Sequence, residues 1–249
     1  MSIDSEKDLI ALREIGRICA IALREMNEHL IPGITTGELD AIGAEILAKY
    51  GARSAPRLVY NFPGTTCISV NEEAAHGIPG ARKVKAGDIV NMDVSAELNG
   101  YFGDTAATYA VPPVSTQTVK LLNCARKALE EAIAISKAGT PISMIGRVIE
   151  HQAQRCGFTT LRELGGHGVG RGLHEAPHEI PTYDNHQTRP RLTEGLVITI
   201  EPFITSGTQR VREDPNGWTL RTMNGSLSAQ FEHSIVITRG KPLILTTIG

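Results

Sequence analysis

The sequence predicts an α+β protein in which two related halves share one central antiparallel sheet flanked by helices. Three features recur in the same order in both halves. A long helix, a break and a shorter helix occur twice, and each half also holds a His-Gly pair (His76-Gly77 and His167-Gly168). A glycine followed by an apolar run that ends in a carboxylate is likewise repeated. We therefore expect residues 1–249 to form one domain, with halves at about 1–110 and 111–249.

Helix signals fall into two pairs. Apolar periodicity and stop signals predict helices over about residues 5–30, 35–50, 115–137 and 143–156. The first helix opens with a capping box of Ser5 and Asp8, and the second opens with a box of Thr35 and Glu38. Each pair is therefore expected to be a long helix followed by a shorter one.

The stretch GDIVNMDVSAELNGYFGDTA predicts a hairpin that carries two acids. Its Asn99-Gly100 loop suits a two-residue type I′ turn, because both positions tolerate positive φ. That turn sets Ser95 opposite Asp104 and makes Asp93 and Asp104 diagonal neighbours, roughly 7–8 Å apart at the backbone. A bulge at Gly103 is the alternative, and it would turn the two acids to opposite faces.

The second half carries matching acids. Glu201 follows Gly195 at the same distance as Asp93 follows Gly87, and Glu232 lies in the next strand candidate, AQFEHSIVIT. Each acid taken alone would be an ordinary strand-end or hairpin residue. Because the acids match between halves, we expect all four to converge.

Converging buried carboxylates would repel one another unless protons or cations neutralise them. Two divalent cations would balance four carboxylates, and a neutral His167 would complete the ligand set. Oxygen ligands with one imidazole suit Mn, Fe, Co or Zn. Two such ions, about 3.5–4 Å apart, can lower the pKa of a shared water and polarise a carbonyl, which suits amide hydrolysis. Glycines surround His167 in GGHGVGRG, but no G-x-G-x-x-G phosphate-binding frame fits them.

Composition excludes several other classes of function. The formal net charge of −2 gives no support for binding nucleic acid or an anionic membrane. The polar start predicts no signal peptide, and no apolar run reaches the roughly 18 residues of a membrane span. The four cysteines are scattered without a CxxC motif, so we expect buried inert thiols and a cytoplasmic protein.

The ordered motifs NEEAAHGIPG, NMDVSAELNGYFGDTA, GGHGVGRGLHEAPH, TIEP and SLSAQFEHSIVIT closely resemble those of the type I methionine aminopeptidases. The resemblance runs from the first helix to the last strand. It implies the pita-bread fold and hydrolytic removal of the initiator methionine from nascent polypeptides when the second residue is small. It also implies a monomer of the short bacterial form, with transient ribosome association as a further expectation.

The resemblance implies a dinuclear site of Co, Mn, Fe, Zn or Ni whose protein ligands are Asp93, Asp104, His167, Glu201 and Glu232. By that analogy Asp104 and Glu232 bridge the two metals. Asp93 would bind one metal, and His167 and Glu201 the other.

The same analogy implies three further roles in catalysis. Glu201 would move the proton from the attacking water to the leaving amine. His174 would hydrogen-bond the scissile carbonyl, and His76 would contact the substrate backbone.

The methionine pocket of the family corresponds to SAPRLVYNFP and one later tryptophan. The resemblance assigns its lining to Pro56, Val59, Tyr60, Phe62 and Trp218. Pro56 stands where many bacterial relatives have cysteine, and Val59, Tyr60 and Phe62 stand where they have a tyrosine-rich string. The lining stays apolar and aromatic.

Two alternatives share the resemblance. A proline-specific aminopeptidase or prolidase has the same fold but usually an additional N-terminal domain. A binding protein of this fold without catalysis typically lacks some ligands, whereas all five are present here. The remaining histidines, among them His178 and His233, are expected to be solvated or satisfied by hydrogen bonds.

Overall fold

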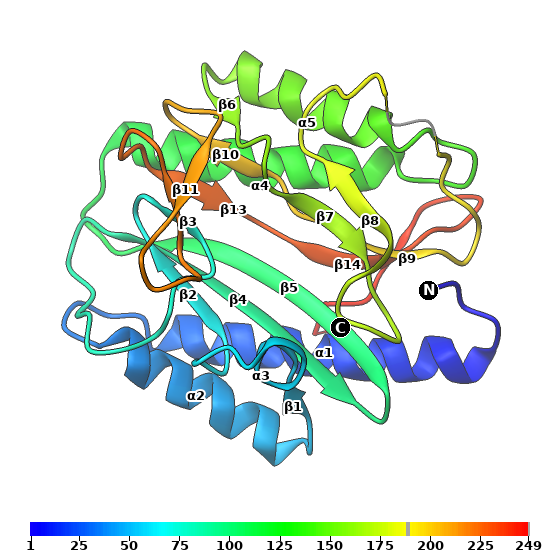
Figure 1. Cartoon of the computed structure of the whole chain (residues 1–249), viewed down its shortest axis with the longest axis horizontal. Helices are drawn as coiled ribbons and strands as arrows, with labels where there is room; N and C mark the ends of the chain where they lie inside the picture. Colours follow the sequence, from blue (N-terminus) through cyan, green and yellow to red (C-terminus); the bar gives the residue numbers. More distant parts are fainter. Residues whose placement is uncertain (188–189, 249) are drawn as a thin grey trace.

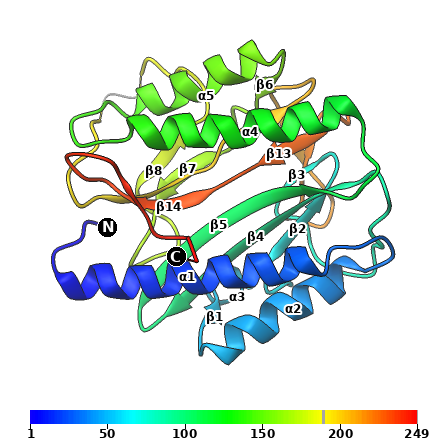
Figure 2. The ribbon, with the colours of Figure 1, turned by 180° about the vertical axis from the view of Figure 1, so that it is seen from behind.

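The computed structural model describes residues 1–187 and 190–248 and places the strands between two helix pairs (Figure 1). Seen from behind, α1 (Glu6–Glu28) and α4 (Thr116–Ile135) lie in front of the strands (Figure 2). The helices are α1 (Glu6–Glu28), α2 (Thr36–Lys49), α3 (Ala55–Tyr60), α4 (Thr116–Ile135) and α5 (Ser143–Arg155). The strands of the first half are β1 (Arg53–Ser54), β2 (Cys67–Val70), β3 (Glu73–Ala75), β4 (Ile89–Leu98) and β5 (Tyr101–Ala110). Those of the second half are β6 (Thr159–Thr160), β7 (Gly165–Gly168), β8 (Glu175–Pro181), β9 (Val197–Ile200), β10 (Phe203–Thr205), β11 (Val211–Glu213), β12 (Leu220–Thr222), β13 (Ser228–Gln230), β14 (His233–Val236) and β15 (Leu243–Ile244).

The four predicted helices are confirmed as α1, α2, α4 and α5, and each pair is a long helix followed by a shorter one. Ser5 caps α1 and Thr35 caps α2, each in a reciprocal capping box with the acid three residues later. Ser115 caps α4 by accepting the backbone N–H of Thr118. Within the described chain, no helix is both long and apolar enough to cross a membrane.

The predicted β4–β5 hairpin and its register are confirmed. Ser95 pairs with Asp104, and Leu98 pairs with Tyr101 across the Asn99-Gly100 turn. Gly103 pairs regularly with Ala96, so the alternative of a bulge there is wrong. The glycine serves close packing instead, because a Cβ on Gly103 would lie 3.1 Å from the backbone nitrogen of Gly16 in α1.

In the second half the acids lie at strand ends. Glu201 follows β9 directly, as the sequence predicts. The stretch AQFEHSIVIT, expected as one strand, divides into β13 and β14 with Glu232 between them. The division arises because β13 pairs with β10 whereas β14 pairs with β9, so Glu232 lies where the chain changes partner strands.

The two halves meet along β5 and the β13–β14 segment. Thr105 donates its hydroxyl to the carbonyl oxygen of Glu232 at 2.8 Å, and Ala107 forms a β-bridge with Phe231. The hydroxyl of Ser234 donates to the carbonyl oxygen of Asp104 at 2.7 Å. One hydrophobic core spans both helix pairs and the strands between them. The acids of both halves are thereby held at a buried junction.

Candidate metal centre and active-site cavity

The structure brings the five predicted metal ligands together in one cavity of about 390 Å³. Asp93 and Asp104 come from β4 and β5, His167 from β7, and Glu201 and Glu232 from strand ends of the second half. The two aspartates share one face because the hairpin has the regular register described above. Both halves therefore contribute acids to a single site.

Ligand atoms of Asp104, His167 and Glu232 all lie within 4.8 Å of one another. The Nε2 atom of His167 lies 3.5 Å from Oε1 of Glu201 and 3.7 Å from Oδ2 of Asp104. These separations are longer than a good hydrogen bond. The histidine therefore faces these two acids without a direct hydrogen bond to either of them.

The histidine presents a free lone pair to the acids. Nδ1 of His167 lies 3.0 Å from the carbonyl oxygen of Gly168, so Nδ1 carries the proton and Nε2 does not. Burial lowers the pKa of His167 to about 3, with a smaller effect from His174, and the ring is neutral at pH 7. A neutral imidazole with its second nitrogen bonded to a carbonyl is the usual state of a histidine that ligates a metal.

Burial also raises the pKa of the carboxyl groups. The pKa of Asp93 rises to about 7, and the pKa values of Asp104, Glu201 and Glu232 rise well above the ordinary range through burial and mutual repulsion. Oδ1 of Asp104 is buried and has no hydrogen-bond partner among residues 1–187 and 190–248. An unpaired buried carboxylate oxygen amid other acids fits a site built for cations.

Two polar side chains that the sequence did not single out hold the glutamates. Nε2 of Gln230 donates to Oε2 of Glu201 at 3.0 Å and to Oε2 of Glu232 at 3.4 Å. The hydroxyl of Thr199 donates to Oε1 of Glu201 at 3.2 Å. Thr199 and Gln230 each precede a predicted ligand by two positions, so strand alternation was the available signal.

His76 and His174 lie on the exposed side of the cavity. The ring of His174 lies 4.1 Å from the ring of His167, centroid to centroid. Its Nδ1 atom is 2.7 Å from the hydroxyl of Tyr60. The backbone of His76 has a φ of 54°, a left-handed conformation that needs support from its surroundings.

Four of the five predicted pocket residues line the cavity: Pro56, Tyr60, Phe62 and Trp218. The rings of Phe62 and Trp218 meet edge to face at 5.2 Å. Val59 is not among the lining residues and has 43% of its surface exposed. On helix α3 Val59 directly precedes Tyr60, so its side chain is turned by about 100° around the helix axis from that of Tyr60.

The cavity has further walls that sequence reasoning did not assign: Cys67, Ser95, Glu163, Leu164, Gly165, Leu173, His178 and Phe203. His178, expected to be solvated, is exposed and also lines this cavity. Cys67 pairs with Asp93 across β2 and β4, a contact between distant segments that no local pattern signals. Burial raises the pKa of the Cys67 thiol well above its ordinary value, which agrees with the expected inert thiol.

A pseudo-repeated α+β fold with buried carboxylates and a neutral histidine at its junction defines a metal-dependent hydrolase. The family model of metallopeptidase family M24 matches residues 11–239. The chain belongs to this family, and it is therefore a hydrolase of peptide bonds.

Within this family, the chain is similar over its full length to methionine aminopeptidases. Methionine aminopeptidase 2 of Bacillus subtilis (strain 168) is 43% identical over 249 residues, which cover 100% of both chains. A methionine aminopeptidase structure from Thermotoga maritima matches with a TM-score of 0.95 and 37% identity, over 99% of this chain and 100% of that one. The predicted resemblance to methionine aminopeptidases and the predicted pita-bread fold are confirmed.

The prolidase of Pyrococcus furiosus shares the fold at a TM-score of 0.79 and 21% identity. This chain covers 65% of that prolidase, compared with 100% of the methionine aminopeptidases. The likeness to the prolidase extends to the fold alone.

Proposed function

We propose that the protein is an aminopeptidase that removes the initiator methionine from polypeptides and prefers a small second residue. The convergence of four buried carboxylates and His167 in a cavity with an apolar aromatic wall carries this proposal. The acids supply a site for cations, and the wall supplies a surface for a thioether side chain. The full-length similarity to methionine aminopeptidases supports the same activity.

We propose that five side chains hold two divalent ions drawn from Co, Mn, Fe, Zn and Ni: Asp93, Asp104, His167, Glu201 and Glu232. The unpaired Oδ1 of Asp104 and the neutral His167 fit such ions. Ligand atoms of Asp104, His167 and Glu232 lie within 4.8 Å of one another, so these three residues would hold metal together. When bound, the ions would lower the pKa of a water and polarise the scissile carbonyl.

The residues of the chain would then handle the proton and the developing charge. Glu201, oriented by Thr199 and Gln230, would take the proton of the attacking water and deliver it to the leaving amine nitrogen. If the Tyr60 hydroxyl donates to Nδ1 of His174, the ring carries its proton on Nε2. That N–H would donate to the carbonyl oxygen as negative charge forms there. His76 would contact the substrate backbone.

The methionine side chain would occupy the part of the cavity walled by Pro56, Phe62 and Trp218. A thioether packs favourably against aromatic rings, with sulfur about 5 Å from the ring. The edge-to-face pair of Phe62 and Trp218 provides that surface. Val59, exposed on α3, would contribute to selectivity only indirectly.

We also propose that residues 1–249 act as one catalytic domain, because the cavity takes lining residues from both halves. The scattered cysteines support a cytoplasmic location. The substrates would be the N-termini of nascent chains, met during transient ribosome association by a monomeric enzyme.

The proposal is tested with peptides that separate the two activities found on this fold. Chelator-stripped protein is loaded with Mn²⁺ or Co²⁺ and assayed on Met-Ala-Ser and Ala-Pro-Ser. We expect methionine release from the first peptide only, and only with metal present. Preference for Ala-Pro-Ser would assign the chain to the proline-specific class. No turnover of either peptide by metal-loaded protein would favour a binding protein.

A further inference from the structure

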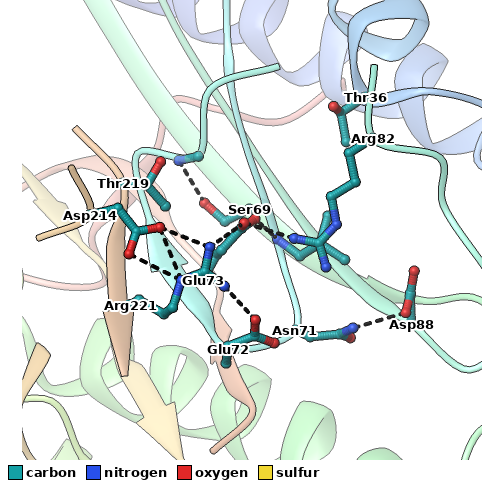
Figure 3. A network of polar contacts seen from close by, with 12 residues as sticks. Thr36, Ser69, Asn71, Glu72, Glu73, Arg82, Asp88, Asp214, Thr219 and Arg221 are labelled. Atoms are coloured by element: carbon teal, nitrogen blue, oxygen red, sulfur yellow. Dashed lines mark hydrogen bonds and ion pairs between the residues drawn. The ribbon is translucent and has the colours of Figure 1, made fainter. Parts of the chain in front are cut away.

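Arg221 of strand β12 contacts three carboxylates that come from two separate segments (Figure 3). Its guanidinium donates to Asp214 through Nε, 3.2 Å from Oδ1, and through Nη2, 2.8 Å from Oδ2. Nη2 also donates to Oε1 of Glu73 at 2.9 Å, and Nη1 donates to Oε1 of Glu72. The arginine side chain is 21% exposed, so these pairs are partly withdrawn from water. Bidentate contacts of this kind fix geometry as well as charge.

The segments joined by Arg221 lead directly to two walls of the cavity. Glu73 opens β3, and His76 follows the last residue of that strand. Asp214 opens the turn before Trp218, and its backbone N–H donates to the carbonyl oxygen of Thr219 at 2.8 Å. One guanidinium thus connects the strand of His76 with the turn of Trp218.

Backbone contacts also join these segments: β12 pairs with β3, and the backbone N–H of Thr222 donates to the carbonyl oxygen of Glu72 at 2.9 Å. The hydroxyl of Thr219 donates to the carbonyl oxygen of His76 at 3.4 Å, near the limit for a hydrogen bond. Asn216 accepts the backbone N–H groups of Trp218 and Thr219 at 2.9 Å and so shapes the turn internally. The pairing of β12 with β3 shifts register between Leu220 and Arg221, which makes the strand contact irregular.

Arg221 balances the negative charges of Glu72, Glu73 and Asp214 where the two segments meet. Arg82 donates to Oε1 of Glu73 at 2.7 Å and is the second cation of the network (Figure 3). Without Arg221, Glu73 would still pair with Arg82, but Glu72 and Asp214 would each lose their ion pair with Arg221. The remaining carboxylates would repel one another and separate the two segments.

Arg221 does not line the cavity, so its effect on substrate must pass through other residues. We propose that Arg221 is a positioning residue that clamps the His76 strand to the Trp218 turn and thereby sets the pocket for the first side chain of the substrate. The substrate part of this inference rests on the proposed function. The positional part does not, because it concerns Trp218 itself.

Trp218 provides a direct readout, because it is the only tryptophan in the sequence. The variants Arg221→Ala and Arg221→Lys are compared with Arg239→Ala, which removes a 2.7 Å ion pair to Glu194 at a site where the arginine is 85% exposed. Each metal-loaded variant is measured for tryptophan emission and acrylamide quenching, for bound metal, and for kcat and KM on Met-Ala-Ser.

For Arg221→Ala we expect red-shifted emission, stronger quenching and unchanged metal content. We expect KM to rise about 10-fold or more while kcat changes much less, because ground-state placement of the substrate is lost. For Arg221→Lys we expect emission, quenching and KM between those of Arg221→Ala and the parent. An ammonium group can pair with one carboxylate but cannot make the bidentate contact of a guanidinium. Arg239→Ala should match the parent protein.

If Arg221→Ala does not fold, Asp214→Asn weakens the same clamp with a smaller change and should give the same shifts. Parent-like emission and KM in these variants would overturn the proposal. A fall in metal content or in kcat alone would also overturn it, because either would place the effect at the metal ligands. If the parent does not cleave Met-Ala-Ser, the proposed function fails, and tryptophan emission still decides whether Arg221 positions Trp218.

Discussion

The backbone N–H of Glu232 donates to the carbonyl oxygen of Ala106 at 2.8 Å. This bond joins the two halves next to the acids, since Asp104 lies two residues before Ala106 on the same strand. The site therefore exists only when the halves are docked. Changes that loosen the docking should affect stability and metal binding together.

Gly103 packs closely against the backbone of α1. A Cβ at this position would lie 3.1 Å from the nitrogen and 3.2 Å from the Cα of Gly16, both backbone atoms of the helix. We expect Gly103→Ala to lower the free energy of unfolding by about 1–3 kcal/mol, measured by denaturant titration. Gly80→Ala is the matched control, because its Cβ would meet nothing within 4 Å. Equal stability of the two variants would contradict this assignment.

Asp8 stabilises the fold in a pH-dependent way. Its carboxylate accepts the hydroxyl of Tyr101 at 2.7 Å and Nη2 of Arg171 at 3.1 Å, and it closes the capping box with Ser5. The Tyr101 hydrogen bond, followed by that of Ser5, lowers the pKa of Asp8 from 3.8 to about 2. A lowered pKa means that the stabilisation is complete above the unfolded value and is lost as the pH falls from about 4 to 2.

We therefore expect Asp8→Asn to be less stable than the parent protein at pH 7 and to approach it at pH 2. Thermal unfolding at both pH values measures the difference, with exposed Asp4→Asn as the control. A stability difference that is the same at pH 7 and pH 2 would show that the charge of Asp8 is not its source.

The hydroxyl of Tyr60 orients His174 through the 2.7 Å contact with Nδ1. Tyr60→Phe keeps the aromatic wall but removes this contact with His174. We expect kcat for Met-Ala-Ser to fall about 10-fold with little change in KM, as for other residues that orient a catalytic group. Tyr50→Phe, on the surface at the end of α2, is the control. Parent-like kcat in Tyr60→Phe would exclude this role.

Local signals predicted the parts of the fold that depend on neighbouring residues. Capping boxes at Ser5 and Thr35 located helix starts, and the Asn99-Gly100 turn fixed a register that placed two acids on one face. Repetition of glycine and acid spacing then pointed to Glu201 and Glu232. These features were readable because each is set within a few positions along the chain.

Contacts between distant segments were not predictable in the same way. Cys67 lines the cavity because β2 pairs with β4. Arg221 contacts Glu73 of β3 and Asp214 before the Trp218 turn, two segments that are far apart in the sequence. The exposure of Val59 was not predictable for another reason. An apolar stretch does not reveal which of its residues a short helix turns toward solvent. The break at Glu232 depends on two partner strands, which the apolar pattern of that stretch does not specify.

The most direct test asks whether acids from both halves bind the same divalent ions. It is isothermal titration calorimetry of chelator-stripped protein with Mn²⁺. We predict two ions bound to each parent chain and the loss of at least one in Asp104→Asn, while the control Glu194→Gln, which alters an exposed ion pair, keeps both. Binding by Asp104→Asn with the stoichiometry and affinity of the parent, or no binding by the parent, would contradict the account.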